Sequence, residues 1–355
     1  MLAIHCATGS FSAGWVEYCK EHRIPYKEVN CFADDIIAQL QGCTMLMWHW
    51  EHHDYRATLF ARQLIASVEA LGVRVFPNTH TCWHYDDKVG QKYLLEAIGA
   101  PLVPSHVFYH RDTAMAWLEH AKFPLVWKLR GGAGSQNVRL VHDLREARRI
   151  VRRSFGTGWR PDRLHALRER LWQFRKAPSL RSFADIGRGL VRTVVPHEKH
   201  RNQLVERNYV YVQEFIPGLT FDIRVVVIGN RCYAFRRMTR DGDFRASGSG
   251  SMDHNPKQIS LSVIATAFEV AGKMRTQSVA FDFVQTDSKA LIIEVSYAFA
   301  LKGYRNCPGW WDRDLTWHEG QVRPEAFMIE DILADNDMLP QPATPVTAPG
   351  NQSAA

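Results

Sequence analysis

The sequence predicts a mixed α/β protein, and three observations lead to this prediction. Over residues 1–84, short apolar runs alternate with amphipathic helical patterns, which is typical of a parallel sheet with flanking helices. Beyond residue 208, strand-like runs come in pairs separated by turn residues, which is typical of antiparallel hairpins. Of 355 residues, 46% are hydrophobic and 23% charged, so the chain can bury a sizeable core in two or three domains. This composition excludes a wholly disordered, collagen-like or coiled-coil protein.

Residues 1–84 are predicted to form a small α/β domain by themselves. The expected elements, in chain order, are a strand (2–6), a helix (12–21), a strand (44–50), a helix (57–71) and a strand (73–76). Gly72 is expected to end the second helix.

The next region combines a helix with a strand that carries a lysine. Residues 87–98 are expected to be a helix ended by Gly99 and Pro101. Residues 124–129 are expected to be a strand that leads into a glycine-rich loop. The predicted buried face of the helix is Val89, Tyr93, Leu94, Ala97 and Ile98.

A basic segment follows at residues 144–208. It holds 17 Lys and Arg against 6 Asp and Glu, a local charge of +11, so the rest of the chain sums to −4 within the overall +7. Asp143 is expected to cap a helix that buries Ala147, Ile150 and Val151. Residues 161–176 are predicted to form an amphipathic helix, so we interpret the segment as a helical insertion that guides an anionic substrate or partner.

The last third of the chain is predicted to contain two hairpins. The expected elements are a strand (209–215), a hairpin (223–228 and 231–237), a small-residue loop (244–251), a helix (261–274) and a second hairpin (279–284 and 291–295). Gly229 and Asn230 give the first hairpin a two-residue turn. Residues 333–355 are predicted to be a disordered tail.

The compartment expected from the sequence is the cytoplasm. The seven cysteines are far apart and contain no CxxC pair, which is typical of reduced thiols. No apolar run approaches the ~20 residues of a membrane helix, and the N-terminus lacks a basic region typical of a secretory signal.

Two carboxylates are expected to lie side by side on the second hairpin. Alternation places Glu294 and Ser296 on one face, and the turn near Ser288 places Asp282 opposite Glu294 within about one residue. Such a pair would repel unless a cation lay between them, and Mg²⁺ is typically held by one or two carboxylates together with phosphates. The alternative is a pair of edge-strand carboxylates that face water.

Basic side chains and glycines supply phosphate-binding chemistry elsewhere. Lys128 lies within an apolar strand, where it needs an anionic partner, and Gly131–Ser135 can approach a phosphate through backbone N–H groups. Lys88 lies in the first turn of a helix, although it could equally be a solvated surface lysine. Arg224, Arg237 and Arg245 could bind phosphate, or they could pair with Asp222, Asp241 or Asp243.

In this order, the pieces resemble the ATP-grasp superfamily, particularly RimK-like carboxylate–amine ligases. The matching stretches are DDKVGQKYLLEAIGAPLVPS, FPLVWKLRGGAGSQNVRLV, VYVQEFIPGLTFDIRVVVIGNRCYAFRRM, GDFRASGSG, VAFDFVQTD and LIIEVS. The resemblance covers most of residues 1–300 apart from the basic insertion. It implies an ATP-grasp fold at residues 85–332 (85–143, the insertion 144–208, and 209–332) after a pre-ATP-grasp α/β domain at 1–84.

The resemblance also implies a role for each matching residue. Those expected to bind ATP are Lys88, Lys128, Gly131, Gly132, Gly134, Ser135, Gln213, Glu214, Phe215, Ile216 and Asp222. Among them, Gln213–Ile216 match the segment that meets the adenine, with Glu214 and the backbone of Phe215 and Ile216 as its contacts. Arg237 and Arg245 match catalytic arginines near the γ-phosphate, and Asp282, Glu294 and Ser296 match the Mg²⁺ ligands. Ser296 departs from the family, which usually has Asn at this position.

The resemblance implies a ligase that uses ATP and Mg²⁺ to join a carboxylate to an amine through an acyl-phosphate. The expected partners are small-molecule or peptide substrates, expected to be anionic, and a homodimer stays open. Two alternatives remain: an ATP-grasp phosphotransferase, and a protein that docks nucleic acid or anionic lipid through residues 144–208.

Overall fold

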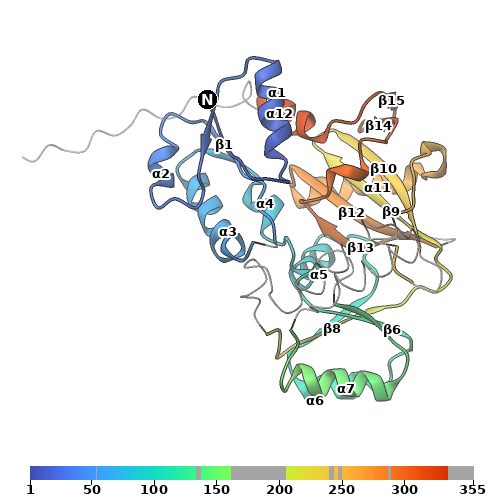
Figure 1. Cartoon of the computed structure of the whole chain (residues 1–355). Coiled ribbons are helices and arrows are strands. Elements are labelled where there is room, and N and C mark those ends of the chain that lie inside the picture. The colour runs from blue at the N-terminus through green and yellow to red at the C-terminus, as the bar shows by residue number, and fades with distance from the viewer. Residues whose placement is uncertain are drawn as a thin grey trace, which may run out of the picture.

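The computed structural model describes residues 1–52, 54–132, 137–160, 205–239, 244–246, 250–286 and 289–334. Three sheets organise these residues, and helices cover the sheets from outside (Figure 1). The mixed α/β class predicted from the sequence is confirmed. The predicted helix at 161–176 and the predicted tail beyond residue 334 lie outside the described ranges.

The N-terminal sheet is parallel and has the strand order β2-β1-β3-β4. Its strands are β1 (Leu2–His5), β2 (Tyr26–Val29), β3 (Met45–Met47) and β4 (Arg74–Phe76), and its helices are α1 (Ser12–Glu21), α2 (Ile36–Gln39), α3 (Tyr55–Ala70) and α4 (Thr79–Cys82). The parallel sheet predicted for this region is confirmed, and β2 and α2 are additions to it. The strand expected at 44–50 is shorter, because the chain leaves the sheet after Met47.

The large sheet has the order β13-β12-β9-β10-β14-β15, with β11 beside β10. Its strands are β9 (Phe221–Ile228), β10 (Arg231–Met238), β11 (Met252–Asp253), β12 (Ser278–Gln285), β13 (Ala290–Ser296), β14 (Gly309–Trp311) and β15 (Trp317–Glu319). Both predicted hairpins are confirmed. At the first turn only glycine fits, since a Cβ on Gly229 would lie 2.1 Å from an oxygen of Asp331.

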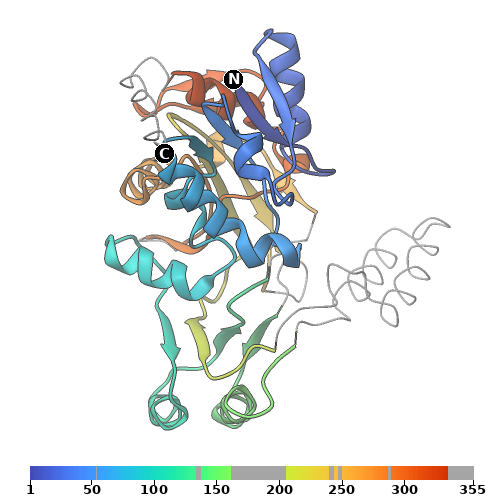
Figure 2. The same ribbon diagram turned by 90° about the vertical axis from the view of Figure 1, so that its left-hand side faces the viewer.

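Each face of the large sheet packs into a separate core. On one face, Val225, Val227 and Phe281 pack against α11 (Leu261–Met274). On the opposite face, Val226 and Ala280 join a core shared with α1, the N-terminal sheet and α12 (Pro324–Ala334). The N-terminal domain therefore sits against the large sheet rather than apart from it (Figures 1 and 2).

The third sheet is small and antiparallel, with the order β5-β8-β6-β7. Its strands are β5 (Ser105–Phe108), β6 (Leu125–Lys128), β7 (Val138–Val141) and β8 (Val210–Glu214), and its two helices are α6 (Arg111–Leu118) and α7 (Leu144–Ser154). Asp143 caps α7 by accepting the Glu146 N–H at 2.7 Å, as predicted. Figure 2 shows α6 and α7 side by side below this sheet.

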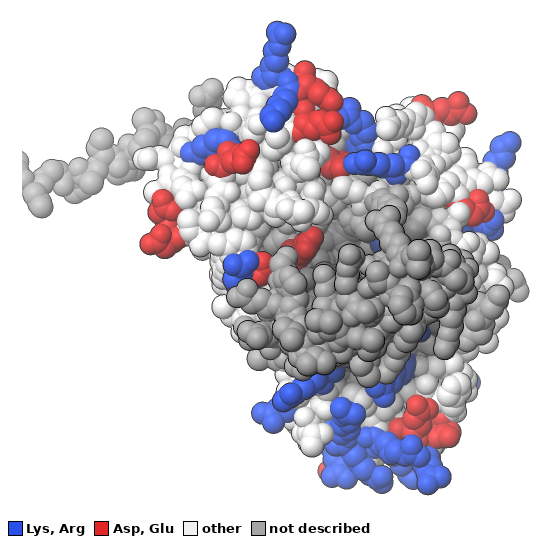
Figure 3. Space-filling model, viewed as in Figure 1, with Lys and Arg blue, Asp and Glu red and all other residues white. Residues whose placement is uncertain are grey.

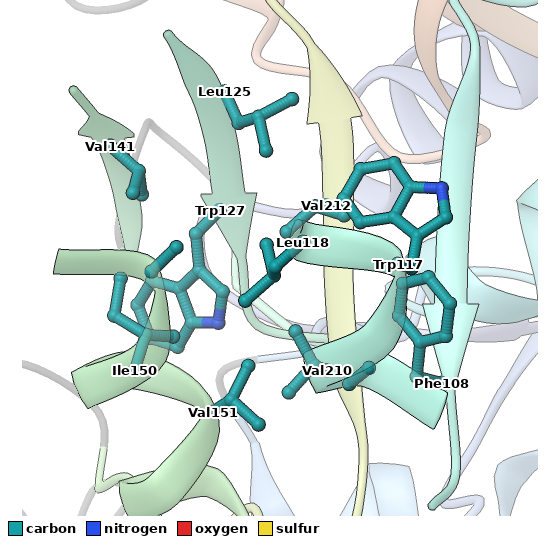
Figure 4. A pocket seen from close by; sticks show the side chains of 12 residues that line it. Phe108, Trp117, Leu118, Leu125, Trp127, Val141, Ile150, Val151, Val210 and Val212 are labelled. Carbon is teal, nitrogen blue, oxygen red and sulfur yellow. The ribbon is translucent and has the colours of Figure 1, made fainter. Parts of the chain in front are cut away.

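The core of the small sheet is apolar and well filled. Strand alternation turns Leu125, Trp127, Val210 and Val212 toward the two helices. Figure 4 shows these side chains pointing at Leu118, Ile150 and Val151 around a cavity of about 10 Å³. That volume is about what one water needs, so the cavity is a packing defect and not a ligand site.

Helix α5 (Lys88–Ala97) connects the N-terminal domain to the other two sheets, and its predicted buried face is only partly right. Leu94 and Ile98 pack against the core of the large sheet, as predicted, but Tyr93 and Ala97 are exposed. The buried residues are Lys88, Gln91 and Leu95, whereas Tyr93 is 46% exposed. Among the described residues, no helix has the length and hydropathy needed to cross a membrane.

Apolar side chains buried on the large sheet should contribute strongly to the free energy of unfolding. Phe281 is fully buried on β12, between β9 and β13. We expect Phe281→Ala to lower the free energy of unfolding by about 3–5 kcal/mol through lost burial and a cavity, measured by guanidinium denaturation. The control Leu59→Ala removes a side chain that is 63% exposed and should change it by about 0.5 kcal/mol or less. A loss under about 1 kcal/mol for Phe281→Ala would contradict the packing described here.

Candidate active site

One face of the large sheet is turned toward the N-terminal domain. At one end of this face the side chains are charged. Asp222 and Arg224 lie on β9, Arg237 on β10, Asp282 on β12 and Glu294 on β13. The same face is apolar further along, where it enters the core shared with α1 and α12. The sheet therefore gathers basic and acidic side chains at the edge of a core that buries them.

The two predicted carboxylates are direct cross-strand partners. Asp282 pairs with Glu294, and the next pair is Phe283 with Ile292, so Ile293 is an extra residue in β13. This β-bulge changes the alternation: Ile292 and Val295 face α11, while Glu294 lies on the opposite face beside Asp282. Bulges are typical next to active sites, where they redirect a side chain.

Two arginines neutralise Asp282 from neighbouring strands. Arg224 contacts both carboxylate oxygens, the second at 3.0 Å from Nη2 to Oδ2, and Arg237 Nη2 lies 2.9 Å from Oδ2. Arg237 also binds Asp222 through two bonds of 2.7 and 2.6 Å. Burial would raise the pKa of Asp282, but the guanidinium groups outweigh burial and hold it below its ordinary value.

Lys88 brings α5 into contact with the carboxylate strand. Its Nζ lies 3.1 Å from Glu294 Oε1 and donates to the Gly132 carbonyl at 2.7 Å. Burial favours the neutral amine, but Glu294 and Asp86 outweigh burial and raise the pKa of Lys88. This lysine is therefore buried and charged, and the solvated-surface alternative is excluded.

Lys128 approaches the same place from the small sheet. It is 5% exposed, and its Nζ donates to Gln213 Oε1 at 2.6 Å. Burial lowers the pKa of Lys128 to about 8, against the opposing effect of Glu294. Its charge is therefore present below about pH 8 and is lost as the pH rises through that value.

The glycine loop begins beside these lysines. The Gly132 N–H donates to Asp86 Oδ1 at 2.7 Å, and the Lys88 N–H donates to the Arg130 carbonyl at 3.0 Å. A Cβ on Gly131 would lie 3.1 Å from Asp86, so the loop passes close to that carboxylate. Gly134 and Ser135 lie outside the described ranges.

The segment after β8 packs against the residue before Arg245. Glu214 is exposed and pairs by its backbone with Pro104 at 2.9 Å. Phe215 and Ile216 are half-buried, and the Phe215 ring packs edge-on against Phe244 at 5.9 Å. Their predicted contact with adenine stays a prediction, as does the predicted role of Asp222, whose carboxylate here binds Arg237.

The carboxylates fit a Mg²⁺ ion that substrate phosphates also hold. Asp282 and Glu294 are neighbours on one face and partly exposed, at 15% and 29%. Within the described ranges, no three acidic, His or Cys side chains group as a metal site by themselves, which agrees with the Mg²⁺ preference for few carboxylates plus phosphate oxygens. The Ser296 hydroxyl donates to the Ala298 carbonyl at 2.7 Å, so only its lone pairs remain for a metal.

The sequence reasoning missed several residues of this site. Asp86 was not singled out, although it directly precedes the helix cap Asp87 and has a left-handed backbone, with a φ of 54°. Gln213 was predicted only as part of the segment that meets the adenine. Its bond to Lys128 joins two strands that are far apart in the sequence, so the sequence pattern does not reveal it. Ser105 and Ile293, which also contact Gln213, carry no sequence signal.

Comparison with known proteins identifies the fold. Residues 186–309 match a sequence model described as RimK-like ATP-grasp domain. No curated protein sequence matches the chain. The match supports the resemblance deduced from the sequence motifs.

Solved structures match over nearly the whole chain. A RimK domain protein from Sphaerobacter thermophilus DSM 20745 has 14% identity and a TM-score of 0.54, covering 93% of this chain and 98% of its own. The D-alanine–D-alanine ligase from Bacillus anthracis has 12% identity and a TM-score of 0.56, covering 95% and 98%. The ligase PsnB, solved with a precursor peptide and AMPPNP, has 13% identity and a TM-score of 0.52 over 95% and 98%.

The chain therefore has the ATP-grasp fold that the sequence predicts, and residues 186–309 are similar to the RimK-like ATP-grasp domain, so the predicted resemblance and fold are confirmed. The family model at residues 186–309 agrees with the enzyme class that the resemblance implies, an ATP-grasp ligase that uses ATP and Mg²⁺. The individual site residues remain predictions, which the geometry above makes testable.

The Arg237 pairs should be essential for stability. We expect Arg237→Met to lower the free energy of unfolding by about 3 kcal/mol, because two buried carboxylates lose a partner. The control Arg236→Met, on the same strand, removes a more exposed pair with Asp253 and should cost about 1 kcal/mol or less. Equal losses in denaturant melts would contradict the buried network.

Proposed function

We propose that this protein is an ATP-dependent carboxylate–amine ligase that forms an amide through an acyl-phosphate and releases ADP and phosphate. One observation carries the proposal: Lys88, Lys128 and two arginines converge on the Asp282–Glu294 pair beside a glycine loop. Cations that surround a carboxylate pair beside a glycine loop suit a magnesium nucleotide better than any uncharged ligand.

The proposed division of labour follows from the contacts. Lys128 and Lys88 would bind the triphosphate from the small sheet and from α5, and Arg237 and Arg245 would lie near the transferring phosphoryl group. Mg²⁺ held by Asp282 and Glu294 would neutralise charge on the phosphates. Because Arg224, Arg237 and Lys88 already contact these carboxylates, they are positioned to move onto phosphate oxygens when the nucleotide binds.

The acceptor site is proposed at the N-terminal sheet. In open parallel sheets, ligands bind at the carboxyl ends of strands where the strand order reverses, and here that point lies between β1 and β3. The end of β13 reaches it: the Tyr297 hydroxyl donates to the Trp50 carbonyl at 2.6 Å, and Phe299 packs on Phe11. A substrate there would lie next to the strand that carries Glu294.

A buried donor supports an anionic acceptor at this point. His49 Nδ1 accepts the Phe11 N–H at 3.0 Å, so the neutral ring carries its proton on Nε2. Burial lowers the pKa of His49 to about 3, so it stays neutral. Its Nε2–H has no partner among the described residues, and a substrate carboxylate would supply the acceptor.

The carboxylate pair gives the direct test. We expect Asp282→Asn and Glu294→Gln each to lower ATP turnover at least about 100-fold, because each removes a charge that holds the metal and phosphates. ADP release would be measured in a screen of amino acids, peptides and sugar acids, with mass spectrometry of the products. Asp253→Asn is the control, since that carboxylate lies on β11 and pairs with Arg236.

Normal turnover in both carboxylate variants would contradict the site. Hydroxylamine trapping distinguishes the ligase from a phosphotransferase that would use the same phosphate-binding residues. A hydroxamate of the carboxylate substrate supports the ligase, whereas a phosphorylated product without hydroxamate indicates a phosphotransferase.

A second candidate function is polyanion docking, and a row of arginines on α7 favours it. Arg145, Arg149 and Arg152 are exposed and recur at helical spacing. Among the described residues, none of the three has an ion-pair partner. Figure 3 shows Lys and Arg gathered on the lower part of the molecule, where α6 and α7 lie.

Docking by this row should depend on salt. If it binds a polyanion, affinity for DNA, RNA or acidic vesicles should fall as salt rises, and Arg145→Glu/Arg149→Glu/Arg152→Glu should abolish binding while ATP turnover persists. Lys20→Glu/Arg23→Glu/Lys257→Glu makes the same charge change at exposed positions elsewhere. Equal effects of both triple variants in fluorescence anisotropy would indicate general charge attraction only.

A further inference from the structure

Gln213 lies where the small sheet meets the carboxylate strand. It is a diagonal cross-strand neighbour of Lys128, since Gln213 pairs with Val126 and Lys128 pairs with Tyr211. Its Oε1 accepts from Lys128 Nζ at 2.6 Å, and both side chains are buried, at 3% and 5% exposure. Among the described residues, no other hydrogen bond reaches this ammonium.

The orientation of the Gln213 amide is fixed by its other contacts. Nε2 donates to Ser105 Oγ at 3.0 Å and to the Ile293 carbonyl at 3.4 Å. Ser105 in turn donates to the Val103 carbonyl at 2.8 Å and accepts from the Tyr211 hydroxyl at 3.1 Å. A flipped amide would turn its NH₂ group toward an ammonium and its oxygen toward a carbonyl, so only one orientation satisfies the network.

The contact with Ile293 ties the network to the metal strand. Ile293 is the extra residue of the β-bulge, and a bulged residue is left out of the regular ladder. Its carbonyl can therefore accept from Gln213, and the next residue is Glu294. One amide thus connects Lys128, on the small sheet, to the strand that presents the carboxylate.

We propose that Gln213 is a positioning residue that holds the Lys128 ammonium in the nucleotide site and fixes its place relative to β13. The inference rests on the proposed function, because it requires a nucleotide to bind at Lys128. It differs from the contact with adenine that the sequence resemblance implies for this residue, because here Gln213 acts through the lysine.

The charges around Lys128 show why an acceptor matters there. Burial and the positive charge of Lys88 on α5 favour the neutral amine of Lys128. The negative charges of Glu294 on β13 and Asp282 on β12 favour its ammonium form. Without Gln213, the ammonium would lose its hydrogen-bonded partner and keep its burial. Lys128 would then lose its proton at a lower pH than about 8, the value in the intact site.

The test measures ADP affinity by calorimetry with Mg²⁺ from pH 6.5 to 9, for the full-length protein. We expect Gln213→Leu to weaken ADP binding about tenfold or more at pH 7.5 and to move the alkaline loss of affinity to lower pH. Gln213→Glu keeps an acceptor in the same place and adds a negative charge that favours the ammonium. It should move the alkaline loss to higher pH and restore part of the affinity, because its second oxygen faces the Ile293 carbonyl without a proton to donate. Gln63→Glu makes the same change at an exposed position on α3 as a control.

Each outcome decides something different. If the wild type binds ADP and Gln213→Leu matches it at every pH, or if Gln213→Glu loses affinity at the same pH as Gln213→Leu, the positioning role is overturned and the proposed function stands. If the wild type binds neither ADP nor ATP, the proposed function fails and this inference fails with it. Should Gln213→Leu not fold by circular dichroism, Ser105→Ala removes one acceptor of the amide. It should weaken binding a few-fold with the same shift to lower pH, and wild-type behaviour would overturn the inference.

Discussion

The cost of burying ionised groups at one end of the large sheet is the constraint on which the site depends. Asp222, Asp282 and Glu294 would repel one another if they stood alone on this face. Arg224, Arg237 and Lys88 offset that repulsion. Arg237 Nη2 lies 2.6 Å from Asp222 and 2.9 Å from Asp282, Lys88 Nζ lies 3.1 Å from Glu294, and Arg224 contacts Asp282. Each cation comes from a different element, β9, β10 and α5, so the network also fixes the helix and strands relative to one another.

The β-bulge at Ile293 lets one strand serve a core and a charged site together. Without it, Ile292 and Glu294 would share a face, and either an apolar side chain would enter the site or a carboxylate would enter the core against α11. With it, Ile292 and Val295 both pack against α11, while Glu294 faces Lys88. The same irregularity gives Gln213 a carbonyl to bind, so a local backbone feature links two sheets.

Sequence patterns predicted the features that local periodicity controls. Alternation and turn residues were sufficient for both hairpins and for the Asp282–Glu294 pairing, and Asp143 was sufficient for the start of α7. The buried face of α5 was predicted only in part: Leu94 and Ile98 pack against the core, but Lys88 and Gln91 also point inward. A rule that buries apolar residues must fail where a helix turns polar groups toward a site. For the arginines, the sequence could not decide between phosphate and a nearby aspartate as the partner. Only the pairing of the strands shows that Arg237 binds Asp222 and Asp282 together.

The excess positive charge of the chain and the charge of the site have separate origins. The charged end of the large sheet combines three carboxylates with Arg224, Arg237, Lys88 and the nearby Lys128, so its own balance is close to neutral. The arginines of α7 lie across the small sheet from Lys128, because strand alternation sends Trp127 toward α7 and Lys128 the other way. Charges on that outer surface are screened by salt, whereas the buried pairs are much less so. Ionic strength should therefore act on any partner of α7 while leaving the internal geometry of the proposed nucleotide site intact.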